Sequence, residues 1–183
     1  MSHRFPNTSK IIIDGLDLLK IAVKDEGIDI ELEAAAEYYF DEYFLELISN
    51  KDLLTFGKNY LLFEMSYNIR PADFESGIYE MLKNGYKPVL AHPERYIYMH
   101  DNFEQYRSLK SNGVFLQLNL NSLNGYYSKP VQKIAKRLVD ENLIDFVGSD
   151  VHSMRHVKSL EKAFKTKEYA KVSKTGSILN DTL

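Results

Sequence analysis

Strand-like apolar runs alternate with helix-like segments along the 183-residue chain, and this alternation limits the fold more than any other feature. Runs such as "NYLLFEMS" and "KPVLA" are separated by amphipathic segments, two of which end at Gly85 and Gly113. The β-α-β-α order with short connections predicts an α/β fold with a parallel sheet covered by helices. No linker or charge block interrupts the pattern, so we expect residues 1–183 to form a single domain.

The first helix is predicted from a cap at Asn7 or Thr8 to about Glu26, with Gly27 ending it. Its apolar residues recur with helical spacing, which predicts that one face is buried. The residues expected on or near that face are Ile12, Ile13, Leu16, Leu19, Ile21 and Val23.

Composition excludes several functional classes. The net charge of −3 argues against a general nucleic-acid-binding protein. The absence of cysteine excludes disulfides and thiolate metal sites. No apolar run approaches the length of a membrane span, and the N-terminus "MSHRFPNTSK" has no apolar signal segment, so a cytoplasmic location is expected.

A polar residue recurs at the predicted carboxyl end of each strand. These residues are Glu37, Glu64, His92, Asn119 and Asp150, at intervals of 27, 28, 27 and 31 residues. The carboxyl ends of parallel strands meet at one rim, where active sites of closed β/α barrels lie. Because Asp, Glu and His without Cys suit Mn²⁺, Fe²⁺ or Zn²⁺, the pattern predicts a metal site formed by Glu37, Glu64, His92, Asp150 and His152.

Each of these residues alone has an ordinary structural explanation. A carboxylate at a strand end often caps a helix or lies on the surface, and a lone histidine is often a core residue. Asn119 is better explained as structural, or as a group that supports a ligand, than as a ligand itself. The shared position and the shared spacing favour the metal site.

Two arginines each follow a predicted histidine ligand by three residues. Arg95 follows His92, and Arg155 follows His152. A guanidinium binds phosphate oxygens through two parallel hydrogen bonds, although surface ion pairs are the commoner role of arginine. Carboxylates, imidazoles and arginines at one rim predict metal-assisted hydrolysis of a phosphoester, with Arg95 and Arg155 as catalytic residues that orient the phosphoryl group.

Five segments resemble the bacterial tyrosine-protein phosphatases of the PHP (polymerase and histidinol phosphatase) superfamily. These enzymes are encoded with genes for capsular or extracellular polysaccharide synthesis. The resemblance covers essentially the whole chain, and the combination of the third and fifth segments is its most specific part. The segments are "EAAAEYYFDE", "LLFEMS", "VLAHPERY", "LQLNLNSLNGYYSKPV" and "VGSDVH".

The resemblance implies a PHP-type distorted β/α barrel, TIM-like and seven-stranded, with a manganese cluster. It implies dephosphorylation of the phosphotyrosine tail of a bacterial tyrosine kinase that regulates polysaccharide chain length. By the same resemblance, the residues predicted above as ligands match the ligands of the family. Arg95 matches the arginine of its "HPER" motif, and Arg155 is a weaker match because the spacing after the Asp-x-His pair varies.

The chain departs from the family pattern at its N-terminus. Family members begin with a strand carrying His-x-His and later have a "TPH" segment, and neither occurs here. The resemblance therefore implies an N-terminally incomplete barrel, from an internal start or as a natural remnant. We expect weakened metal binding, and an unpaired sheet edge that favours self-association.

Three functional hypotheses follow for this chain. The first is a metal-dependent protein-tyrosine phosphatase, whose activity is reduced or lost in the truncated form. The second is a non-catalytic module that binds phosphotyrosine. The third is another PHP phosphoesterase, such as one resembling histidinol phosphatase.

Overall fold

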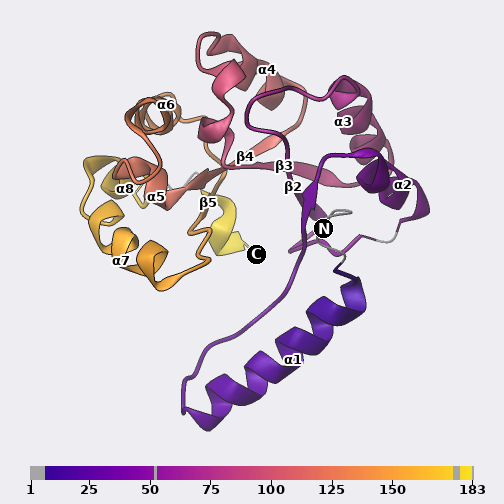
Figure 1. The fold of residues 1–183 in the computed structure, drawn as a ribbon, viewed down its shortest axis with the longest axis vertical. Helices are drawn as coiled ribbons and strands as arrows, with labels where there is room; N and C mark the ends of the chain where they lie inside the picture. Colours follow the sequence, from indigo (N-terminus) through magenta and orange to yellow (C-terminus); the bar gives the residue numbers. More distant parts are fainter. Residues whose placement is uncertain (1–6, 52, 175–177, 183) are drawn as a thin grey trace. The chain divides into compact units, whose positions relative to one another are not determined.

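The computed structural model describes residues 7–51, 53–174 and 178–182, which fall into two compact units (Figure 1). The first unit contains the residues up to Met65 together with Asp73–Pro88. The second contains Ser66–Ala72 and the residues from Val89 onward. Within the described ranges, no helix has both the length and the apolar character that crossing a membrane requires.

The strands form a five-stranded sheet in which they follow one another in chain order. Parallel pairing of β1 with β2, β3 with β4, and β4 with β5 confirms the predicted α/β fold with a parallel sheet. The prediction of a seven-stranded TIM-like barrel is wrong for the described residues. The sheet is open, with β1 and β5 at its edges, whereas a barrel requires the first and last strands to pair. The strands are β1 (Glu37–Tyr39), β2 (Tyr60–Glu64), β3 (Lys87–Ala91), β4 (Phe115–Asn119) and β5 (Phe146–Gly148).

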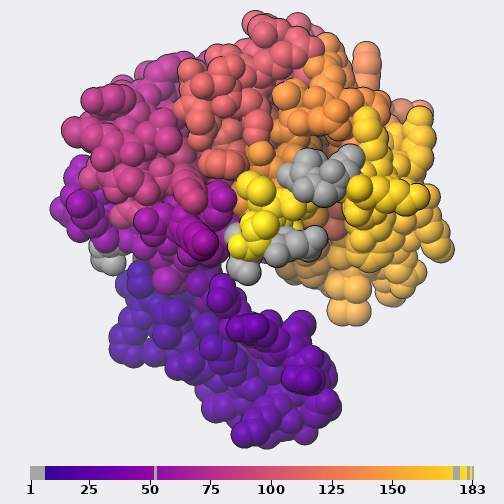
Figure 2. Space-filling view, turned by 180° about the vertical axis from the view of Figure 1, so that it is seen from behind, coloured from indigo at the N-terminus to yellow at the C-terminus, as the bar shows by residue number. Residues whose placement is uncertain are grey.

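The outer edge of β5 is occupied by the short 3-10 helix η3, Leu179–Thr182 (yellow in Figure 2). The Asn180 amide accepts a hydrogen bond from Val147 N at 2.9 Å and donates one to Val147 O at 3.0 Å. Leu179 N donates to Asp145 O at 2.8 Å. Side-chain and loop groups therefore satisfy the backbone where a further strand would have to pair.

An aromatic cluster forms the core of the first unit. The rings of Tyr38, Phe40, Phe44, Phe63 and Phe74 lie with centroids 5.2–6.4 Å apart. They come from β1, β2, the residue after β1, and the helices α2 (Glu42–Asn50) and α3 (Phe74–Lys83). This cluster packs both helices against the strand pair and so fixes the place of the two carboxylates that these strands carry.

Helix α1, Ser9–Asp25, starts where the sequence predicts, with Thr8 Oγ1 accepting from Ile11 N at 3.2 Å. The prediction of a buried face is wrong, because none of its residues is buried and Leu18 remains 70% exposed. Helical spacing of apolar residues shows which face can be covered, but covering it needs a partner element.

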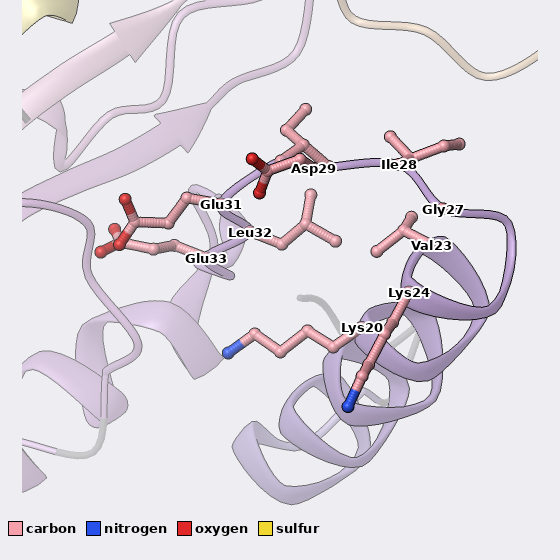
Figure 3. Close-up of a pocket in the computed structure, with 10 residues that line it drawn as sticks. Lys20, Val23, Lys24, Gly27, Ile28, Asp29, Glu31, Leu32 and Glu33 are labelled. Carbon is pink, nitrogen blue, oxygen red and sulfur yellow. The ribbon is translucent and has the colours of Figure 1, made fainter.

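A groove of about 550 Å³ separates α1 from the extended segment that follows it (Figure 3). Lys20 and Lys24 line it on the helix, and Asp29, Glu31 and Glu33 line it on the segment. The alternating character of residues 28–39, "IDIELEAAAEYY", predicts a strand. Residues 28–36 are not in a strand, and β1 contains only Glu37–Tyr39.

The core of the second unit lies between β4 and its helices. Leu116 and Leu118 of β4 are fully buried, as are Phe146 of β5 and Leu138 of α6. The sequence pattern predicts helices at about residues 102–112, 129–142 and 156–169. Helices α4 and α6 match the first two, whereas the third is divided into α7 and α8. The elements η1, η2 and α5 are too short for helical periodicity to reveal them. The elements are η1 (Pro93–Arg95), η2 (Ile97–Met99), α4 (Glu104–Ser111), α5 (Leu120–Leu123), α6 (Lys129–Asp140), α7 (Met154–Ala163) and α8 (Lys167–Val172).

Candidate functional site

The strand pair of the first unit carries two of the predicted ligands. Glu64 is the last residue of β2, as predicted. Glu37 is the first residue of β1 rather than its last, because this strand is only three residues long. The register pairs Glu37 with Leu62 and Tyr39 with Glu64, so the two carboxylates lie two positions apart along adjacent parallel strands.

Two predicted ligands in the second unit have a left-handed backbone. His92 directly follows β3 with φ +34°, and Asp150 lies two residues beyond β5 with φ +47°. Such a conformation costs a non-glycine residue about 1–3 kcal/mol and is concentrated at functional sites. The left-handed backbone therefore indicates that the surrounding structure holds both residues in place.

Glu94 anchors the turn that carries His92 and Arg95. Its side chain is fully buried, and Oε1 accepts hydrogen bonds from Ser122 Oγ at 2.6 Å and from Asn119 N at 3.2 Å. Burial raises the pKa of Glu94, and the hydrogen bond from Ser122 opposes this shift. The carboxyl group thereby ties η1 to the end of β4 and to α5.

Arg95 lies between two tyrosine rings and pairs with Asp150. Its guanidinium carbon is 4.5 Å from the ring centroid of Tyr67 and 4.5 Å from that of Tyr127. Arg95 Nη1 donates to Asp150 Oδ2 at 3.0 Å, and the two side chains are 19% and 20% exposed. Within the described residues, Nε and Nη2 of Arg95 make no hydrogen bond, so this edge of the guanidinium remains open to a ligand.

Asn119 supports the same carboxylate. Its Nδ2 donates to Asp150 Oδ2 at 2.9 Å and to the Tyr127 hydroxyl at 2.8 Å. Burial, together with the negative charge of Asp150, raises the pKa of Tyr127, and the positive charge of Arg95 opposes the shift. Asp150 is therefore held by a neutral amide and by a guanidinium, and the phenol stays protonated near neutral pH.

His152 follows Asp150 and is 73% exposed. Its Nδ1 lies 3.1 Å from Asp150 Oδ1, and its backbone N–H donates to His156 Nδ1 at 3.1 Å. His156 packs edge-on against the ring of Tyr126 with centroids 5.1 Å apart, and it holds the backbone at His152. Arg155 on α7 is exposed and forms no ion pair among the residues that the structure describes.

Glu37 and Glu64 are the two predicted ligands of the first unit, which places them on adjacent parallel strands. His92, Asp150 and His152 belong to the second unit. Carboxylates and imidazoles are donors that Mn²⁺, Fe²⁺ and Zn²⁺ accept.

No sequence pattern predicts a role for Glu94, Ser122, Tyr67 or Tyr127. Glu94 belongs to the "HPER" segment, where a fully buried carboxylate cannot be told from a surface one. The two tyrosines carry no signal of their own in a chain with 13 tyrosines. Their place on both faces of Arg95 becomes visible only in the folded chain.

Comparison with known proteins identifies the family. Residues 1–175 match the family model described as capsular polysaccharide synthesis, CpsB/CapC. The chain belongs to this family. A stretch of 155 residues is 28% identical to CapC of Staphylococcus aureus, and the match covers 84% of this chain and 61% of that protein.

Two further relatives carry names that state an activity. Tyrosine-protein phosphatase YwqE of Bacillus subtilis is 33% identical over 109 residues, which are 59% of this chain and 43% of YwqE. Tyrosine-protein phosphatase CpsB of Streptococcus pneumoniae is 28% identical over 151 residues, 79% of this chain and 62% of CpsB. The chain thus spans about three fifths or less of the length of these relatives.

A solved structure extends the similarity within the family to three dimensions. It comes from work on YwqE and S. pneumoniae CpsB, described as unique metal-dependent tyrosine phosphatases. The TM-score is 0.78 at 26% sequence identity, and the match covers 97% of this chain and 76% of the other. The fold of this chain is therefore similar to that of a large part of that structure.

Proposed function

We propose that this chain acts in a metal-dependent protein-tyrosine phosphatase of capsule or extracellular polysaccharide synthesis. The observation that carries the proposal is the pair of carboxylates of Glu37 and Glu64, which lie two positions apart on adjacent parallel strands of the first unit. The names of the relatives support the choice of phosphotyrosine as substrate. In this proposal, residues 1–183 function as one PHP-type domain.

The metal ligands in this proposal are Glu37, Glu64, His92, Asp150 and His152. Mn²⁺ is our first choice of ion, with Fe²⁺ and Zn²⁺ as alternatives for the same donors. When bound, such an ion would polarise a phosphoryl oxygen and would lower the pKa of a coordinated water near neutral pH. The left-handed backbone at His92 and Asp150 supports the assignment, since such conformations are concentrated at functional sites.

Arg95 is proposed to bind and orient the phosphoryl group. Its Nη1 donates a hydrogen bond to Asp150, and the rings of Tyr67 and Tyr127 pack against the guanidinium. The remaining edge offers the parallel N–H groups of Nε and Nη2, which match two phosphate oxygens. Arg155 is proposed as a second, more mobile cation for the same anion because its side chain is exposed.

We propose the phosphotyrosine tail of a bacterial tyrosine kinase as the partner and the cytoplasm as the compartment. The family description, capsular polysaccharide synthesis, supports this setting. We also propose that copies of the chain associate through the open sheet, because an edge strand such as β1 presents backbone groups that favour pairing.

The test compares metal binding and turnover in matched variants. We expect the wild-type chain to bind Mn²⁺ in equilibrium dialysis and to release phosphate from a phosphotyrosine peptide in a Mn²⁺-dependent manner. Glu64→Gln should weaken Mn²⁺ binding and lower turnover at least about 10-fold, because a neutral amide is a poorer ligand than a carboxylate. Glu46→Gln on the exposed face of α2 is the control and should change neither. Equal Mn²⁺ affinity in all three proteins would contradict the metal site.

Binding of phosphotyrosine without turnover is the second candidate function. It is favoured by one observation, namely that Arg95 and its aromatic partners all lie in the second unit and need no residue of the first. Phosphopeptide binding that is weakened by Arg95→Ala but is accompanied by no phosphate release would support it.

A further inference from the structure

A cavity of about 390 Å³ opens beside Arg95 within the second unit. Its volume falls in the range of roughly 300–1,000 Å³ that is usual for small-molecule sites. Arg95 and His100 supply its basic groups, and none of its lining residues carries a carboxylate. The cavity is therefore suited to an anion that carries an apolar group.

The apolar wall of this cavity contains Ile97, Pro130 and Val131. Ile97 is 58% exposed although it is large and aliphatic, and it belongs to η2, directly after the turn that carries Arg95. The backbone holds this wall in place, because Ile97 N donates to Tyr67 O at 2.9 Å. Ile97, Pro130 and Val131 therefore give the cavity an aliphatic wall beside the guanidinium of Arg95.

The first turn of α6 forms another part of the lining. Ser128 caps this helix by accepting from Val131 N at 3.3 Å, and Pro130 stands in the first turn. The positive end of the helix dipole at this turn adds to the charge of Arg95 in favouring an anionic ligand. The cavity thus combines the cationic side chain of Arg95 with the apolar wall.

We infer that this cavity binds the aromatic ring of a phosphotyrosine side chain, with the phosphoryl group on the open edge of Arg95 and the ring against Ile97, Pro130 and Val131. This inference rests on the proposed function for its choice of ligand. It assigns a specificity role to Ile97 in particular, since alkyl phosphates such as phosphoserine reach Arg95 but place no ring on the aliphatic wall.

The experiment measures peptide binding by fluorescence anisotropy with Mn²⁺ present. One peptide carries the non-hydrolysable phosphotyrosine analogue phosphonomethylphenylalanine, and a second peptide of the same sequence carries phosphoserine. We expect the wild-type chain to prefer the aryl peptide. Ile97→Ser should weaken aryl binding about 3- to 10-fold and leave phosphoserine binding unchanged, because only the ring contacts this side chain.

Ile69→Ser is the matched control, because Ile69 belongs to the same unit, is 72% exposed and does not line the cavity. Both isoleucines are largely exposed, so neither substitution threatens the fold. Arg95→Ala should weaken binding of both peptides. The inference is overturned if the wild-type chain binds neither peptide, if it binds both equally, or if Ile97→Ser behaves like Ile69→Ser.

Phosphate release from a phosphotyrosine peptide, measured on the same proteins, separates this inference from the proposed function. Selective aryl binding that Ile97→Ser weakens, without any Mn²⁺-dependent release, supports the cavity and contradicts the phosphatase proposal. Mn²⁺-dependent release with no difference between aryl and alkyl binding supports the phosphatase proposal and contradicts the cavity.

Discussion

Ser122→Ala isolates the interaction that fixes the turn carrying His92 and Arg95. Ser122 and Glu94 are both fully buried, and the hydroxyl donates to the carboxylate at 2.6 Å. The substitution removes one oxygen atom and creates almost no cavity. Its effect on stability therefore reports the hydrogen bond rather than lost packing.

At a pH above the raised pKa of Glu94, the expected loss is about 2 kcal/mol in the free energy of unfolding, since hydrogen bonds to charged groups contribute about 1.5–3 kcal/mol. After the substitution, Glu94 Oε1 keeps only the bond from Asn119 N, and Oε2 has no hydrogen-bond partner among the described residues. For a chain of this size, such a loss lowers the melting temperature by about 4–8 °C.

Urea unfolding of the metal-free chain, followed by far-ultraviolet circular dichroism, measures this loss. Ser108→Ala on the exposed face of α4 is the control and should stay within about 0.5 kcal/mol of wild type. In a Glu94→Gln background, Ser122→Ala should cost only about 1 kcal/mol, because the remaining bond is between neutral groups. A loss below about 0.5 kcal/mol for Ser122→Ala in the wild-type background would refute the anchoring role of Glu94.

Three further perturbations test the fold. Leu118→Ala in β4 should cost about 2–5 kcal/mol in urea unfolding because the side chain is fully buried, whereas Leu18→Ala on the uncovered α1 should change stability by less than about 0.5 kcal/mol. Gly77→Ala should lower the free energy of unfolding by about 1–3 kcal/mol or more, because the new Cβ would lie 2.3 Å from Cζ of Phe40. If this variant is as stable as wild type, the ring of Phe40 moves freely and the reasoning is wrong. Thr8→Ala should destabilise the first turn of α1 locally by about 1 kcal/mol, seen as faster amide hydrogen exchange there with unchanged global unfolding.

Helix starts and strand ends could be predicted from the sequence because they depend on neighbouring residues. Thr8 caps α1, and Gly85 and Gly113 follow the ends of α3 and α4 with φ of +84° and +83°. Glu64 and Asn119 end their strands as the sequence predicts. These features require only local chemistry, namely a side-chain cap, a left-handed backbone, or an apolar run followed by a polar residue.

The arrangement around Arg95 could not be predicted because it joins distant parts of the chain. Tyr67, Arg95, Tyr127 and Asp150 meet only when the loops after β2, β3, β4 and β5 have folded. The burial of Glu94 likewise depends on Ser122, which lies 28 residues further along the chain. Sequence spacing predicts that strand ends approach one another, but not which side chains then touch.

The sequence by itself determined the α/β class, the order of helices and strands, and the polar residues that end the strands. Tertiary structure decided that the sheet is open, with Asn180 satisfying the edge of β5 where a barrel would need another strand. It also left the apolar face of α1 uncovered. The physical reason is the same in both cases. Helical periodicity and capping depend on residues that are close together in the sequence. Pairing at a sheet edge and burial of a helix face depend instead on which distant element packs against them.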